Sequence, residues 1–248
     1  MRGARAVPLL VALAGGGCAG IVEVPVETPL QSKLDVSRFR RILIAGFVTD
    51  LETSDVDLSS ETARLLQNQL RSNTKLQVLE PDHPPLQEAL SQVLEKLGEQ
   101  GRYNKEEKEQ FRLEADKLLQ DPEYWRKMGE EYQQPLIVAG QLDFESQNRA
   151  GVQPDERVAR TSTGQPTLVR SSRFMERKGY VLSADFYFID SKTGELLHKE
   201  KFSEEVLYAE DQRVSPLSSY FELMDRLLPN FLGVLTPQRI RGTRVLLR

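Results

Sequence analysis

The stretch RILIAGFV, residues 41–48, decides the fold class of this protein. It is a near-continuous apolar run, which is typical of a strand that is buried on both faces of a sheet. A helix is predicted over 59–73, where Ser59 or Ser60 can cap its first turn. A short strand at 76–80 follows. This strand–helix–strand succession predicts a βαβ unit in a layered α/β protein.

The next segment, residues 86–134, reads as helical throughout. Its Lys- and Glu-rich part, 98–134, is predicted to be a solvated helical insertion that lies on the main body. Asn104 with Glu107 forms a capping-box pattern, and Asp121 precedes a proline at a first helical position. These caps divide the segment into successive helices.

The second half of the chain switches to strand patterns. Three strands are predicted, at 136–144, 180–188 and 196–206. The segment 190–195 joins the last two as a hairpin turn, in which Gly194 suits a left-handed conformation. Residues 148–172 are rich in Arg, Thr, Gly and Pro, so they are predicted to form a long flexible loop.

An amphipathic helix opens at Ser215 and Pro216, and Pro229 is predicted to end or kink it. Together these elements predict an α/β fold, a two-layer or three-layer sandwich with a mixed sheet of about five strands. Its parts are a βαβ start, an antiparallel meander, a C-terminal amphipathic helix and the helical insertion. Residues 40–248 are predicted to form this single domain.

The start of the chain has the pattern of a processing signal. Two arginines precede a short apolar stretch and three glycines, which is typical of a secretory signal peptide over 1–17. Cys18 follows directly, and the junction resembles the lipobox of bacterial lipoproteins, in which this cysteine is acylated. An ordinary signal cleaved nearby, leaving Cys18 as a free thiol, explains the same residues. Residues 18–39 are predicted to be a lipid-anchored, extended tether.

The composition excludes several classes of protein. The chain has 248 residues, with 33 Lys and Arg against 37 Asp and Glu, a net charge of −4. Removal of 1–17 takes away two arginines and no acidic residue, so the mature charge is −6. A mild acidic balance does not fit a nucleic-acid binder. The single cysteine excludes an intramolecular disulfide and a cysteine-based zinc site.

The sequence contains few candidate catalytic residues. His83 and His198 are the only histidines, and both are predicted to be solvated, one in a loop and one on a strand. There is no Gly-x-Ser-x-Gly elbow and no phosphate-binding glycine pattern. Paired carboxylates are plentiful but have no organised partner for acid–base work. No catalytic, metal or cofactor site is predicted.

The end of the chain is basic. Four arginines alternate there with apolar residues: Arg239, Arg241, Arg244 and Arg248. They could contact anionic lipid headgroups, lipopolysaccharide phosphates or an acidic partner. An edge strand that is protected from aggregation by its charges accounts for the same residues. Both interpretations stay open.

Three blocks of sequence, 41–47, 136–142 and 186–195, carry a family resemblance; the last reads FYFIDSKTGE. In this order they resemble a group that comprises the curli-assembly channel lipoprotein family, the lipoprotein activators of penicillin-binding proteins and the N-terminal domain of TolB. The resemblance implies a non-enzymatic envelope protein that works by binding other proteins. Residues 145–178 depart from the channel branch, because they are charged and lack the sustained apolar alternation of lipid-facing strands.

The sequence thus predicts a membrane-anchored periplasmic lipoprotein of the bacterial cell envelope, on the outer membrane rather than the inner. It is expected to act as a non-enzymatic protein-interaction or envelope-assembly module without a cofactor. Its expected partners are the membrane, reached through the N-terminal lipid, and an envelope protein; nucleic acid is not expected, and homo-oligomerisation is left open. An envelope hydrolase with an unrecognised site and a secretion-channel subunit are the alternatives.

Overall fold

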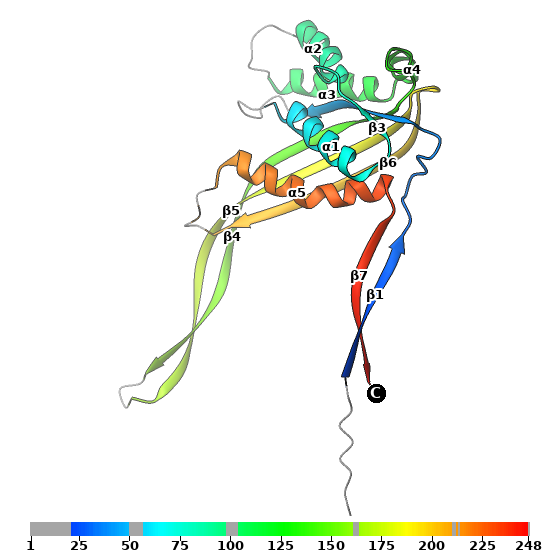
Figure 1. Ribbon diagram of the computed structural model, residues 1–248. Helices are drawn as coiled ribbons and strands as arrows, with labels where there is room; N and C mark the ends of the chain where they lie inside the picture. The colour runs from blue at the N-terminus through cyan, green and yellow to red at the C-terminus, as the bar shows by residue number, and fades with distance from the viewer. Residues whose placement is uncertain are drawn as a thin grey trace, which may run out of the picture. The chain divides into compact units, whose positions relative to one another are not determined.

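The computed structural model describes residues 21–49, 57–97, 104–160, 164–209, 212 and 214–247, so Cys18 and Arg248 lie outside the described residues. The strands are β1 (Ile21–Leu30), β2 (Arg41–Thr49), β3 (Gln77–Leu79), β4 (Leu136–Arg160), β5 (Pro166–Asp190), β6 (Glu195–Tyr208) and β7 (Gln238–Leu247). The helices are α1 (Leu58–Asn73), α2 (Pro85–Leu97), α3 (Lys105–Leu119), α4 (Pro122–Glu131) and α5 (Pro216–Leu235) (Figure 1). Residues 31–236 form one compact unit, and the two terminal segments form another.

The larger unit is built on a five-stranded sheet in the order β3-β2-β4-β5-β6. Strand β2 pairs in parallel with β3 and β4, whereas β4, β5 and β6 are antiparallel neighbours. The turn between β5 and β6 has Gly194 at φ 78°, the left-handed conformation expected there. The predicted α/β class, mixed sheet, βαβ start and meander are therefore confirmed.

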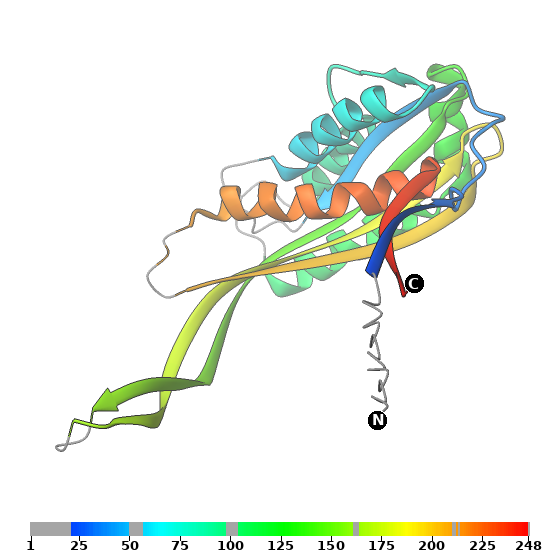
Figure 2. The ribbon, with the colours of Figure 1, turned by 60° about the horizontal axis from the view of Figure 1, so that its bottom comes forward.

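Strand β2 is buried on both faces. Ile42 and Ile44 pack into a core with side chains of α1 and α5, whereas Leu43 and Ala45 pack into a second core with α2, α3 and α4. Successive side chains of a strand point to opposite faces, so this strand needs a helical layer on each side. The fold is a three-layer α/β/α sandwich (Figure 2).

The described part of the predicted insertion, residues 104–134, supplies most of the second helical layer. Phe111 and Ala115 of α3 and Trp125 of α4 are buried against the sheet. The indole N–H of Trp125 donates to the carbonyl of Leu119 at 3.0 Å. The segment is therefore part of the core and not a solvated addition, because its Lys and Glu residues occupy only the outer faces of the helices.

Most of the predicted helix starts are confirmed. The capping box of α3 forms between Asn104 and Glu107, in both directions. Asp121 caps α4 and Ser215 caps α5, each with a proline at the first helical position. Helix α1 differs from the prediction, since its cap is Asp57 and neither of the two serines.

Ser59 has a different function from the predicted one. It is buried, and its hydroxyl accepts a hydrogen bond from the backbone N–H of Phe47 at 3.0 Å. Phe47 follows a register shift in β2, where Gly46 has φ 120° and a Cβ would lie 2.9 Å from the Cβ of Pro84. A hydroxyl of α1 thus satisfies a strand N–H beside this irregularity.

Helix α5 continues through Pro229 to its last residue, Leu235. Of the two predicted outcomes, an end at the proline is therefore wrong, and a kink there stays a prediction. Proline removes one helical hydrogen bond. Phe231 and Val234 beyond it are completely buried in the first core. Burial of these large apolar side chains outweighs the loss of one helical hydrogen bond, so the helix continues past the proline.

Residues 148–160 and 166–172 are strands and not the predicted flexible loop, of which residues 161–163 lie outside the described residues. Strands β4 and β5 have 25 residues each and pair antiparallel along their whole length, while β6 pairs only with the Lys178–Asp190 part of β5. We call the part beyond β6, residues 149–160 and 166–177, the outer β-ribbon. The loop prediction failed because strands that bury no face in a core show no apolar alternation.

Residues 18–39 are likewise not a bare tether, because β1 is paired. It pairs antiparallel with β7, from Ile21 opposite Leu247 to Leu30 opposite Gln238. We call this two-stranded sheet the terminal sheet. The last residues therefore group with the N-terminal segment, and the predicted domain of residues 40–248 is too long at its C-terminal end.

We expect Ser59→Ala to lower the free energy of unfolding by about 1–3 kcal/mol, because the buried N–H of Phe47 loses its acceptor. Ser72→Ala, at an exposed position near the end of the same helix, should change it by less than about 0.5 kcal/mol. Urea denaturation of the two variants measures the difference. Equal losses would contradict the assignment of Ser59 as the acceptor.

Candidate functional site

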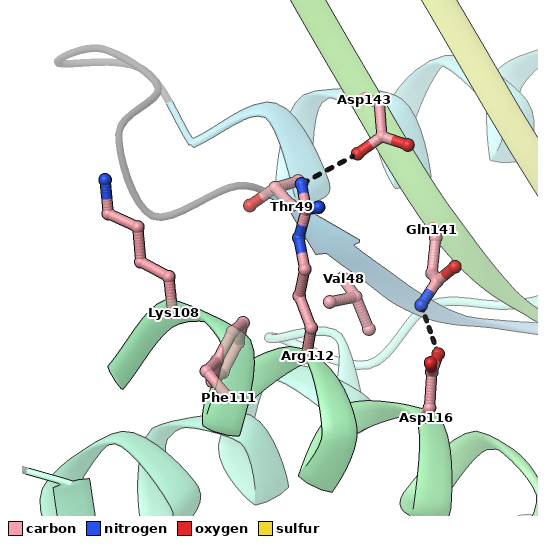
Figure 3. A pocket seen from close by; sticks show the side chains of 8 residues that line it. All are labelled: Val48, Thr49, Lys108, Phe111, Arg112, Asp116, Gln141 and Asp143. Carbon is pink, nitrogen blue, oxygen red and sulfur yellow. Dashed lines mark hydrogen bonds and ion pairs between the residues drawn. The ribbon is translucent and has the colours of Figure 1, made fainter. Parts of the chain in front are cut away.

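A cavity of about 200 Å³ lies at the carboxyl end of β2. Open α/β sheets commonly bind their ligands at the carboxyl ends of strands, so this cavity is the first candidate site. Strands β2 and β4 form one side and α3 the other (Figure 3). The cavity is lined by Val48, Thr49, Lys108, Phe111, Arg112, Asp116, Gln141 and Asp143.

Polar side chains of this cavity bond to each other. Gln141 Nε2 donates to Asp116 Oδ1 at 2.5 Å, and Arg112 Nη2 lies 3.5 Å from Asp143 Oδ1. Cavities for drug-sized ligands are larger, about 300–1,000 Å³, and mostly apolar. The lining contains neither a serine or cysteine nucleophile nor a histidine base.

The structure does not bring the two histidines together. His83 is exposed after β3 and His198 is half-buried on β6, and these strands are the two opposite edges of the sheet. His198 Nε2 lies 2.9 Å from Glu200 Oε2, and Lys33 Nζ lies 2.7 Å from the other oxygen of that carboxylate. The hydrogen bond from Lys33, assisted by His198, holds the pKa of Glu200 below its usual value. Neither histidine lines the cavity.

Among the described residues, each pKa that is resolved as shifted lies farther from neutral pH than the ordinary value of its group. Burial raises the pKa of Tyr220 to about 12 and also raises that of Tyr124. A hydrogen bond with the hydroxyl of Tyr187 raises the pKa of Lys199. General acid–base catalysis favours groups whose pKa lies near the working pH. These groups keep their ordinary charge at neutral pH.

The arginines predicted to contact an anionic partner lie on β7, except Arg248, which is outside the described residues. Arg241 Nε lies 2.9 Å from Glu27 Oε1 across the terminal sheet, and Arg239 Nη1 lies 3.7 Å from Glu27 Oε2. Exposed pairs of this kind contribute about 0–1 kcal/mol. Arg244 is exposed as well. Two of these arginines thus have a cross-strand partner, and contact with an anionic ligand stays a prediction.

The outer β-ribbon is a candidate site that sequence reasoning missed. Among the described strands its two halves pair only with each other, so each has an edge without a neighbour (Figure 1). At the spacing of antiparallel strands it is about 40 Å long. Arg170 Nε lies 2.8 Å from Glu156 Oε1 across it. Val158 and Leu168, which are opposite in register, are 70% and 57% exposed.

Two further kinds of site, a membrane-spanning helix and a metal site, are absent from the part of the chain that the structure describes. No helix there is long and apolar enough to cross a membrane. No group of three or more His, Cys, Asp or Glu side chains there is placed to hold a metal ion.

No protein-family model matches the chain, and no curated protein matches it. Solved structures that are weakly similar to it include two of PelC. The PelC dodecamer from Paraburkholderia phytofirmans has 12% identity and a TM-score of 0.38, over 88% of this chain and 100% of that chain. A single-substitution variant of that dodecamer has 12% identity and a TM-score of 0.39, over 87% and 99%. A similarity at this level assigns no function, and the resemblance to the curli-assembly and TolB group stays a prediction.

A matched pair of variants on β4 separates the outer β-ribbon from the core. We expect Val138→Ala to lower the free energy of unfolding by about 2 kcal/mol or more, because Val138 is completely buried. Val158→Ala on the ribbon should change it by less than about 0.5 kcal/mol. Urea denaturation provides both values. A large loss for Val158→Ala would mean that the ribbon is part of the cooperative core.

Proposed function

We propose that this protein is a lipid-anchored, non-enzymatic protein of the bacterial envelope that assembles with further copies of itself through the outer β-ribbon. The observation that carries the proposal is the ribbon, a long hairpin that pairs with no third strand among the described residues.

The ribbon is an unusual element for a protein that acts alone. A two-stranded hairpin without a packed face is only marginally stable in water. Its unpaired backbone N–H and C=O groups form a template for another strand, and proteins normally cover or shorten such edges. Strand addition by a partner would satisfy these groups, which is a common mode of protein recognition. The exposed apolar pair Val158 and Leu168 would be buried in the same contact.

Charge complementarity favours a second copy as this partner. Residues 149–177 contain six arginines and three acidic residues, a net charge of +3. The mature chain as a whole carries −6, so everything outside the ribbon carries −9. A basic ribbon on an acidic protein attracts the acidic surface of another copy, which speeds association and selects its orientation.

A non-enzymatic role is supported by the chemistry of the described residues. The cavity at the end of β2 is small, and its carboxylates are engaged by Gln141 and Arg112. The two histidines lie at opposite edges of the sheet. The resolved pKa shifts move away from neutrality, which is the opposite of what acid–base catalysis favours.

The envelope location is proposed from the first residues of the sequence. A basic start, a short apolar stretch and three glycines precede Cys18, the single cysteine of the chain. Several acyl chains on one cysteine give stable attachment to a membrane, since each buried methylene contributes about 0.8 kcal/mol. The outer membrane, on its periplasmic side, is the proposed location.

The anchor is tested by metabolic labelling with a radioactive fatty acid. We expect the wild-type chain to be labelled and Cys18→Ser to be unlabelled, because no other cysteine is present to take up an acyl group. Both chains should be compared at equal abundance on an immunoblot. Equal labelling of the two chains would exclude the proposed anchor.

Self-assembly is tested by shortening the ribbon. Residues 152–174 are replaced by an Asn-Gly turn between Gly151 and Met175, which are opposite in register. Light scattering of the detergent-purified protein should show an oligomer for the wild type and a monomer for the shortened chain. Higher salt should weaken the wild-type oligomer, since exposed charges are screened.

No ribbon residue whose side chain is described belongs to either core of the α/β sandwich, so the shortened chain should keep the unfolding midpoint of the wild type. An oligomer that survives the shortening would show that the ribbon is not the contact. A monomeric wild type would overturn self-assembly and leave a different acidic envelope protein as the partner of the ribbon.

A further inference from the structure

The terminal sheet places the C-terminal strand beside the proposed lipid anchor. Ile21, the first residue of β1, pairs with Leu247 at the end of β7. Cys18 is three residues before Ile21, and three extended residues span at most about 11 Å. Residues 21–22 and 245–247, which we call the tip of the terminal sheet, are therefore held close to any acyl chain on Cys18.

The residues of the tip are apolar: Ile21, Val22, Val245, Leu246 and Leu247. Glu23, the direct partner of Val245 in the register, is acidic and exposed. The side chain of Val245 is described, and Val245 is 59% exposed. An apolar end of a small two-stranded sheet has no interior of its own to fill. Because the tip lies next to the proposed lipid anchor, a membrane that holds the anchor would be close to the tip.

The two faces of the terminal sheet differ. Directly paired residues share a face, and successive pairs alternate between the two faces. One face carries Val24 and Val26, which are half-buried, and Leu30, which is 44% exposed. The other carries Glu27 together with Arg239 and Arg241, which are paired to it. Arg244, the partner of Val24, also lies on the first face, and Glu23 with Val245 lies on the second. The first face is thus mainly apolar and the second mainly charged.

The terminal sheet, like the outer β-ribbon, is basic on an acidic protein. Residues 21–30 and 238–248 contain four arginines and two acidic residues, a net charge of +2, whereas the whole mature chain carries −6. Arg244 lies next to the tip, opposite Val24 in the register. Arginines at such a position can extend to lipid phosphates while their methylene groups cover apolar surface.

We propose that the terminal sheet is a second membrane contact, which binds the surface of a bilayer that contains anionic phospholipid. Its tip and apolar face enter the headgroup region, and Arg244 meets the lipid phosphates there. The orientation rests on the proposed acylation of Cys18, which brings the tip to the bilayer. With two points of attachment, the N-terminal segment is fixed at the membrane surface and does not act as a free tether.

The test uses the chain without acyl groups, so that binding reports on the sheet alone. The mature chain with Cys18→Ser has no thiol, and a single cysteine can then be added for an environment-sensitive dye. Val24→Cys places the dye on the apolar face. Thr243→Cys places it on the charged face, one residue pair farther from the tip. Vesicles of phosphatidylcholine, alone or mixed with phosphatidylglycerol, are the membrane probe.

We expect the emission of the Val24→Cys dye to shift to the blue with the mixed vesicles, and that of the Thr243→Cys dye to stay unchanged. Arg244→Gln should weaken vesicle binding about fivefold, the value of one basic residue near an anionic surface. Co-sedimentation of the unlabelled Cys18→Ser chain checks binding without the dye. There, Val24→Asp should abolish binding and Thr243→Asp, which adds the same charge, should retain it.

No binding of the Cys18→Ser chain to mixed vesicles, or equal shifts of the two dyes, would overturn the membrane contact. Both results are independent of the fatty-acid labelling. A chain that binds vesicles but takes up no fatty acid would refute the lipid anchor and support the sheet as a membrane contact. If the wild type is acylated but its Cys18→Ser form does not bind vesicles, the lipid anchor would be supported and the membrane contact of the sheet refuted.

Discussion

The burial of β2 on both faces is the constraint on which the rest of this structure depends. Ile42, Leu43, Ile44 and Ala45 are all completely inaccessible, and they alternate between two cores. A strand of this kind is stable only if helices cover the sheet on both sides. Helices α1 and α5 supply one layer. The other comes from α2, α3 and α4, although α3 is so rich in charge that its sequence resembles a surface addition.

The outer β-ribbon and the terminal sheet, which are the two proposed contact surfaces, lie outside the part of the sheet that helices cover. Strands β4 and β5 have 25 residues each, whereas β6 has 14, so pairing continues after the covered part of the sheet ends. Backbone hydrogen bonds between two strands do not depend on the side chains. The outer β-ribbon is therefore free to be basic, and the terminal sheet can be apolar on one face only. The core positions these elements, and its small cavity stays a minor feature.

Local features of the fold could be predicted, because each depends on a few neighbouring residues. The cap at Asp121, the cap at Ser215 and the left-handed Gly194 all follow from spacings of four residues or fewer. The bonding partner of Ser59 and the continuation of the helix past Pro229 could not be predicted, because both depend on residues that are distant in the sequence. The partner of Ser59 is an N–H on β2, and the helix beyond Pro229 is held by the packing of distant strands on its far end.

The sequence by itself determined the α/β class, the two-sided strand and most of the helix starts, because apolar periodicity and capping residues record local burial directly. The junction at Cys18 stays a prediction. Only the tertiary structure decided that β1 pairs with β7, through contacts such as Arg241 with Glu27 that join residues 214 positions apart. It also decided that 149–160 and 166–177 are strands. The outer β-ribbon pairs through backbone groups, which impose no apolar alternation on its side chains, and the alternating valines of β1 do not show which strand it pairs with. Both pairings therefore become visible only when the chain is folded.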